Sequence, residues 1–126
     1  TGAIIVIARN TDLKFYASTG DIMDAEVSKR LIESIFFKNS PMHDGAIIIS
    51  NNKIKAARCV LPVTENTELP AHYGMRHRAA LGITEQSDAI AIIVSEETGA
   101  ISLARDGELK ANLSPEELEI ILTREL

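Results

Sequence analysis

Runs of aliphatic residues alternate with short polar segments along the first third of the chain. Residues 3–8 are apolar at nearly every position, which predicts a central strand that is covered on both faces. Residues 14–18 are expected to form a short second strand. Val27, Leu31 and Ile35 recur at helical spacing behind Asp24, a favourable N-cap residue. This pattern predicts an amphipathic helix over residues 25–37.

The rest of the chain reads as strand pairs and helices joined by polar turns. Strands are expected at residues 46–50, 54–60, 88–95 and 100–105, and a helix at residues 76–84. The first two strands are joined at Asn51-Asn52, which tolerates the positive φ of a tight hairpin. A long polar loop over residues 62–74 precedes the helix, and loops of this length in compact domains are often functional. Ser114, Pro115 and Glu117 form a capping-box pattern that predicts the start of a last helix.

This order of elements predicts an α/β protein with a mixed central sheet flanked by helices. At 126 residues the chain is long enough for one hydrophobic core, so residues 1–126 are expected to form a single domain. Because 45% of the residues are hydrophobic and only 4% are aromatic, this core is built mainly from aliphatic side chains. The net charge of −5 argues against a general nucleic-acid-binding surface, which would carry a basic stripe.

The cysteine content and the hydropathy of the chain exclude further classes of protein. Cys59 is the only cysteine, which excludes an internal disulfide and a zinc site made of several thiolates. No apolar run approaches the roughly 20 residues of a membrane span, so we expect this chain to be soluble. The chain has no initiator Met, which suggests that it is a piece of a longer protein.

Two polar clusters are the main candidates for chemistry. The first, His43-Asp44-Gly45-Ala46, stands directly before the apolar run that is expected to form a buried strand. One interpretation of Asp44-Gly45 is a tight turn that leads into the strand. The other is a functional site in which Gly45 lets backbone approach a ligand and Asp44 acts on it. His43 is either a metal ligand or a polar residue before the turn.

The second cluster, Gly74-Met75-Arg76-His77-Arg78, stands where the second helix is expected to begin. A solvated basic surface is the plain interpretation. However, cations are unfavourable at a helix N-terminus, where the helix dipole prefers negative charge. Two arginines at that position are better explained if an anion completes the site, and guanidinium groups with helix N–H donors suit phosphate oxygens. A carboxylate and such a basic helix start together favour polyphosphate chemistry.

A third, weaker candidate follows the strand over residues 88–95. Glu96 and Glu97 are readily explained as a solvated turn. Ser95, at the end of a buried strand, is also suited to present its hydroxyl to a phosphate.

With these residues in view, the chain resembles the diadenylate cyclase domain family, and most closely its membrane-anchored CdaA type. Both hallmark motifs of the family are present, as Asp44-Gly45-Ala46 and Arg76-His77-Arg78. Matching segments surround them, namely residues 36–39, 61–62, 79–83 and 95–99. The similarity extends over residues 3–113.

The resemblance implies condensation of two ATP into cyclic di-AMP with release of two pyrophosphates, assisted by a divalent metal, Mg²⁺ or Mn²⁺. It implies that Asp44 lies beside the 3′-hydroxyl and the metal, and that His43 contacts the metal. The other residues that it implies in substrate binding are Gly45, Ala46, Leu61, Met75, Arg76, His77, Arg78, Ser95 and Glu96. Of these, Arg76, His77 and Arg78 surround the phosphates and are expected to be catalytic together with Asp44.

The resemblance also implies partners and a location. Because the product is two-fold symmetric, the simplest catalyst is a face-to-face homodimer in which each domain presents one ATP to the other. In the full-length protein the domain is expected at the cytoplasmic face of the bacterial membrane, with membrane contact only through segments absent from this chain. Regulatory proteins are expected as further partners.

Two residues depart from the family pattern. Met75 replaces a threonine that usually precedes Arg-His-Arg, and Val60 replaces an aromatic residue that is common before Leu61. Loss of base stacking on that residue is worth about 1–3 kcal/mol. These departures keep open a second function, a module that senses ATP or cyclic di-AMP without catalysis. A third class, an interaction domain without a nucleotide site, requires both motifs to be incidental.

Overall fold

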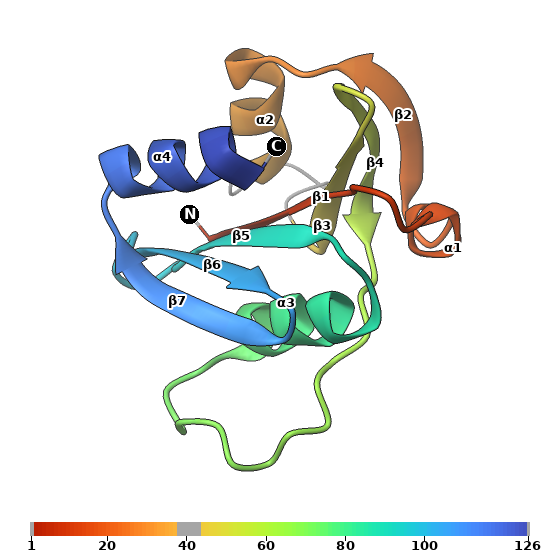
Figure 1. Ribbon diagram of the computed structural model, residues 1–126. Helices are drawn as coiled ribbons and strands as arrows, with labels where there is room; N and C mark the ends of the chain where they lie inside the picture. The colour runs from red at the N-terminus through yellow and green to blue at the C-terminus, as the bar shows by residue number, and fades with distance from the viewer. Residues whose placement is uncertain (1, 38–43, 126) are drawn as a thin grey trace.

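The computed structural model describes residues 2–37 and 44–125 of the chain. Within these residues, seven strands form one sheet in the order β2-β4-β3-β1-β5-β6-β7 (Figure 1). The strands are β1 (Ala3–Ile7), β2 (Asp21–Glu26), β3 (Ala46–Ser50), β4 (Lys53–Cys59), β5 (Ile90–Val94), β6 (Ile101–Arg105) and β7 (Glu108–Leu113). The helices are α1 (Lys14–Ala17), α2 (Lys29–Phe36), α3 (Met75–Gln86) and α4 (Pro115–Glu125). Because β1 pairs with β3 in parallel and with β5 antiparallel, the mixed α/β sheet that was predicted is confirmed.

The central strands are apolar on both faces because helices cover both. Ile4 and Ile93 are register partners on one face and pack with Ala80 and Ile83 of α3. The opposite face is covered by α2 and α4, which lie on the same side of the sheet in Figure 1. There Ile35 is fully buried, as an apolar residue at the inner face of an amphipathic helix should be.

Two elements near the N-terminus differ from the predictions. Residues 14–17 are helical rather than extended, because the Asp12 carboxylate accepts a hydrogen bond from the Lys14 amide (2.8 Å) and closes a local turn. The helix predicted over residues 25–37 is shorter: residues 21–26 form edge strand β2, and Ser28 caps α2. Asp24 therefore lies in a strand, where it pairs with Lys55 of β4 (3.0 Å).

Predictions for the second half agree more closely with the structure. Asn51 and Asn52 both adopt positive φ in the β3–β4 turn. Ser114 and Glu117 make the reciprocal hydrogen bonds of a capping box (2.9 and 3.1 Å). The strand β7 was not predicted, and it extends the sheet by pairing with β6.

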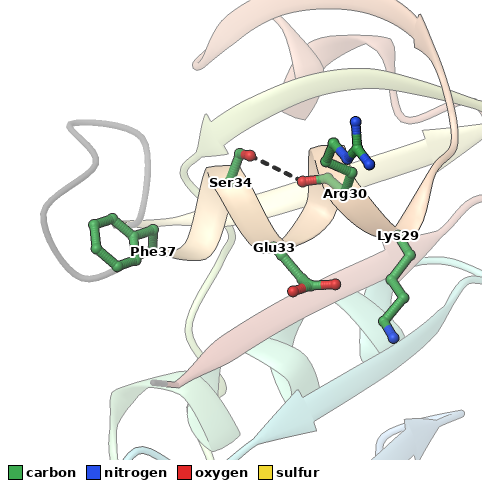
Figure 2. A pocket seen from close by; sticks show the side chains of 5 residues that line it. All are labelled: Lys29, Arg30, Glu33, Ser34 and Phe37. Atoms are coloured by element: carbon green, nitrogen blue, oxygen red, sulfur yellow. Dashed lines mark hydrogen bonds between the residues drawn. The ribbon is translucent and has the colours of Figure 1, made fainter.

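The outer surface of α2 carries a hollow of about 640 Å³ (Figure 2). Its lining side chains are Lys29, Arg30, Glu33, Ser34 and Phe37, all of which come from this one helix or its C-cap. Ser34 is already occupied locally, because its hydroxyl donates to the Arg30 carbonyl (2.9 Å). Among residues 2–37 and 44–125, this hollow brings together none that are distant in sequence, unlike the cleft described next.

Candidate functional site

A cleft of about 1000 Å³ opens where the beginnings of β1 and β3 meet the ends of β4 and β5. The N-terminus of α3 forms its opposite wall. Chemistry-bearing residues that line it are Asp44, Gly45, Arg58, His72, Met75, Arg76, His77, Ser95, Glu96 and Glu97. The two polar clusters of the sequence, about thirty residues apart, therefore face one cavity.

Gly45 fixes the position at which Asp44 enters the cleft. Its φ of +83° lies in the region that only glycine adopts without strain. A Cβ at this position would lie 2.8 Å from the carbonyl carbon of Arg58, on the neighbouring strand β4. Gly45 therefore allows β3 and β4 to close directly behind Asp44, which is exposed at the mouth of the cleft.

The N-terminus of α3 presents backbone donors to the same cavity. Gly74 is the N-cap and supplies no side-chain hydrogen bond, and the helical ladder begins with the Arg78 amide donating to the Gly74 carbonyl (3.2 Å). The amides of residues 75–77 precede that bond and belong to the donors that a helix leaves without internal acceptors. Together with the helix dipole they favour an anion in the cleft.

Arg76 is held between the beginning of β1 and the end of β5. Its guanidinium pairs with Glu96 after β5 (3.2 Å). It also packs against Gly2 before β1, where a Cβ would lie 2.8 Å from its Nη1 nitrogen. The Arg76 side chain is 28% exposed, so its charge is shielded from bulk water on most sides but still lines the cavity.

His77 has an aromatic environment on the loop that precedes α3. Its ring stacks on Tyr73, with centroids 5.3 Å apart and planes at 14°. Burial lowers the pKa of His77 below its ordinary value of 6.5, and the nearby His72 lowers this pKa further. The lowered pKa favours the neutral imidazole of His77, which can donate one hydrogen bond and accept another.

Arg78 does not line the cleft, although the sequence grouped it with Arg76. Its Nε donates to the Tyr73 carbonyl (3.3 Å), and its own carbonyl accepts from the Thr64 amide (3.0 Å). Arg78 thus holds the long loop over residues 62–74 against α3. One turn of helix is enough to direct two neighbouring guanidiniums to different sides.

The remaining predicted residues line the apolar side and the far end of the cleft. Ala46 and Leu61 are buried and form part of the apolar wall of the cleft, whereas Met75 is 66% exposed at its rim. The Ser95 hydroxyl accepts a hydrogen bond from the Thr98 amide (3.3 Å) and so belongs to the turn as well as to the cleft. His43 lies outside the described residues.

Two cleft residues were missed by the sequence analysis. His72 was not among the candidate residues, because no signal in the loop marks it as a neighbour of His77. Arg58 lines the cleft because β4 carries one extra residue opposite β3, between the pairs Ala46–Cys59 and Ile48–Ala56. Such a bulge depends on strand pairing, which no local pattern around Arg58 revealed.

The cleft offers oxygen ligands of the type that Mg²⁺ and Mn²⁺ prefer, in Asp44, Glu96 and Glu97. Among residues 2–37 and 44–125, no group of three or more His, Cys, Asp or Glu side chains is assembled as a complete metal site. Mg²⁺ is commonly held by one or two carboxylates and by phosphates of the substrate. The donor set therefore fits a metal that arrives with a nucleotide.

Comparison with known proteins identifies the family of this chain. The family model described as DisA bacterial checkpoint controller nucleotide-binding (DAC) matches residues 1–109. The chain is 49% identical over 125 residues to a diadenylate cyclase of Listeria monocytogenes, covering 99% of this chain and 46% of the relative. It is 46% identical over 124 residues to the cyclic di-AMP synthase CdaA of Bacillus subtilis, covering 98% and 45%.

Comparison with solved structures gives a relative of the same fold. A double mutant of DacA from Staphylococcus aureus superposes with a TM-score of 0.95 at 46% identity, covering 98% of this chain and 82% of that one. The fold is thus that of an α/β domain whose family is described as nucleotide-binding. The chain belongs to the diadenylate cyclase (DAC) domain family.

The chain spans about half the length of the curated relatives it matches. Within the part that the structure describes, none of the helices has the length and apolar character needed to cross a bilayer.

Proposed function

We propose that this domain is a diadenylate cyclase that condenses two ATP into cyclic di-AMP and releases two pyrophosphates. The observation that carries the proposal is the shared cleft, in which Asp44 and Arg76 line one cavity despite their separation in sequence. Family membership and relatives that are named for this activity support the same conclusion.

In this reaction each ribose 3′ oxygen attacks the α-phosphorus of the other ATP. A new P–O bond forms as the bond from that phosphorus to the pyrophosphate oxygen breaks, and pyrophosphate leaves with the electron pair. Such chemistry depends mainly on position and charge neutralisation. Asp44 accepts a hydrogen bond from the 3′-hydroxyl, orients it and takes up its proton as the new P–O bond forms. Arg76 and the free amides at the start of α3 bind the phosphate oxygens.

The other residues complete binding. Gly45 and Ala46 let the nucleotide approach the backbone, Leu61 packs on the base, and His77, Met75, Ser95 and Glu96 line the polyphosphate end of the cleft. Arg78 contributes by holding the loop in place. Its guanidinium reaches phosphate only if the hydrogen bond from Nε to the Tyr73 carbonyl breaks. Asp44, with His43 or Glu96, would hold Mg²⁺ or Mn²⁺, which supplies additional charge neutralisation when bound.

Catalysis requires a homodimer, because one cleft holds one ATP and the product joins two. A two-fold axis brings two identical clefts face to face. The likeness to CdaA, and to a Bacillus cereus protein described as membrane-spanning (TM-score 0.85, 44% identity), supports a longer, membrane-anchored protein with this domain at the cytoplasmic face. Regulatory proteins would then act on the same membrane-bound assembly.

The test is to incubate the purified domain with ATP and Mn²⁺ and to measure cyclic di-AMP by mass spectrometry. We expect product from the wild type, and a loss of more than about a hundredfold in Asp44→Asn with the fold and most ATP binding retained. ATP binding without product would instead support the sensing module. Loss of folded protein in Asp44→Asn would make Asp44 a structural residue.

A further inference from the structure

Arg58 is a charged cleft residue to which the proposed function assigns no role. Three carboxylates line the described cavity, those of Asp44, Glu96 and Glu97, against the guanidiniums of Arg58 and Arg76. Arg76 is already paired with Glu96. Because Arg78 is directed to the loop, Arg58 supplies the second guanidinium that this cleft offers to an anionic, aromatic ligand such as a nucleotide.

Arg58 lines the same cleft as the apolar residues Val60 and Leu61. Arg58 and Val60 are both exposed, with half of the Arg58 side chain accessible, while Cys59 between them is buried in the core. Arg58 and Val60 nevertheless both line the cleft, on either side of Cys59 along the chain. Val60 and Leu61 form the wall on which a base would pack.

The backbone of Arg58 has a conformation that is unfavourable for a residue other than glycine. Its φ of +58° is left-handed, a conformation in which glycine would be free of strain. An exposed, non-glycine residue at such a position next to a cleft points to a functional constraint. On the outer side, Asp21 of edge strand β2 pairs with the guanidinium (Nη1–Oδ2 3.6 Å). Asp21 itself does not line the cavity, so it steadies the group from outside.

We infer that Arg58 is a specificity-determining residue whose guanidinium packs on the purine base of the bound nucleotide. A planar guanidinium stacks on base faces, which a lysine ammonium does not do. It thereby replaces part of the contact that Val60 is too small and non-aromatic to make. This inference rests on the proposed nucleotide site and adds to it the residue that recognises the base.

The experiment measures the dissociation constants of ATP and of inorganic tripolyphosphate by calorimetry in the presence of Mg²⁺. We expect Arg58→Ala to weaken ATP binding by about tenfold, as loss of one stacking contact does, and to leave tripolyphosphate binding unchanged. Arg58→Lys should recover less than half of the lost ATP affinity, because it restores charge but not the planar group. Arg30→Ala, on the outer surface of α2, is the matched control and should bind both ligands as the wild type does.

Arg58→Gly separates binding from folding. Glycine relieves the left-handed backbone, so this variant should melt at or above the temperature of Arg58→Ala while binding ATP equally weakly. Equal weakening of ATP and tripolyphosphate would overturn the inference in favour of a general charge effect. Full recovery by Arg58→Lys, or unchanged ATP binding in Arg58→Ala, would overturn it as well. Cyclic di-AMP formation by the wild type is scored separately, so a failure of the cyclase proposal is distinguishable from a failure of this one.

Discussion

At the residue scale, Gly45 and Gly99 share a left-handed backbone but differ in what surrounds them. Their φ values are +83° and +74°, but a Cβ at Gly45 would meet the Arg58 backbone at 2.8 Å, whereas a Cβ at Gly99 would meet nothing within 4 Å. The cost of an alanine at each position therefore separates backbone strain from steric contact.

We predict that Gly99→Ala lowers the free energy of unfolding by about 1 kcal/mol, from strain alone. Gly45→Ala should lower it by about 2–4 kcal/mol, because β4 must also move away from β3. Urea denaturation of the two variants and the wild type measures both values. Equal losses would contradict the close approach of the two strands behind Asp44.

Single residues also show how far the sequence predicted the site. Asp44 and Arg76 were predicted together because their chemistry is local: a carboxylate before a buried strand, and cations at a helix start that disfavours them. Both line the cleft. Arg58 and His72 were missed because they reach the cleft through a bulge and a loop. Arg78 was grouped with Arg76 because sequence spacing does not reveal which way a side chain leaves the first turn of a helix.

At the element scale, Gly82 couples α3 to the loop that closes the cleft. A Cβ on Gly82 would lie 1.9 Å from the Pro62 carbonyl oxygen and 3.0 Å from the Thr64 amide nitrogen. The same contact surface is reinforced where the Thr64 hydroxyl donates to the Glu85 carboxylate (2.7 Å). The helix thus fixes the first part of the loop, at Pro62 and Thr64.

We predict that Gly82→Ala destabilises the domain by about 1–2 kcal/mol. Helix propensity alone favours alanine over glycine by about 1 kcal/mol, but insertion against a fixed carbonyl costs more. Thermal and urea unfolding check the sign of the change. Gly74→Ser is the control, since that N-cap position has open space and serine is a preferred cap. A stabilised Gly82→Ala protein would show that the loop does not pack closely on α3.

Elements were predicted best where local pattern and tertiary structure agree. The aliphatic strands β1, β3 and β5, the Asn51-Asn52 turn and the Ser114 capping box each carry a local signal, and all are present. The polar edge strands β2 and β7 have mixed burial and are extended because a neighbouring strand pairs with them. The sequence between Asp21 and Glu26 gives no period-2 pattern strong enough to predict that pairing.

At the scale of the whole molecule, the sheet acts as the frame that brings distant segments to one edge. The beginnings of β1 and β3 and the ends of β4 and β5 meet there because β1 runs parallel to β3 and antiparallel to β5. The fold class followed from the order of elements, and the proposal that this edge is the functional one followed from the motifs. The strand order across the sheet required long-range pairings that no local pattern encodes.

The central claim is that the start of β3 and the start of α3 act on one nucleotide. The most direct measurement is a crystal structure of the domain with Mg²⁺ and 3′-deoxy-ATP, which lacks the attacking hydroxyl. The account predicts one nucleotide in the cleft, with its 3′ carbon beside the Asp44 carboxylate and its phosphates on the Arg76 guanidinium and the first amides of α3. A nucleotide bound elsewhere, or one that contacts the Arg76 end while its ribose lies away from Asp44, would contradict it.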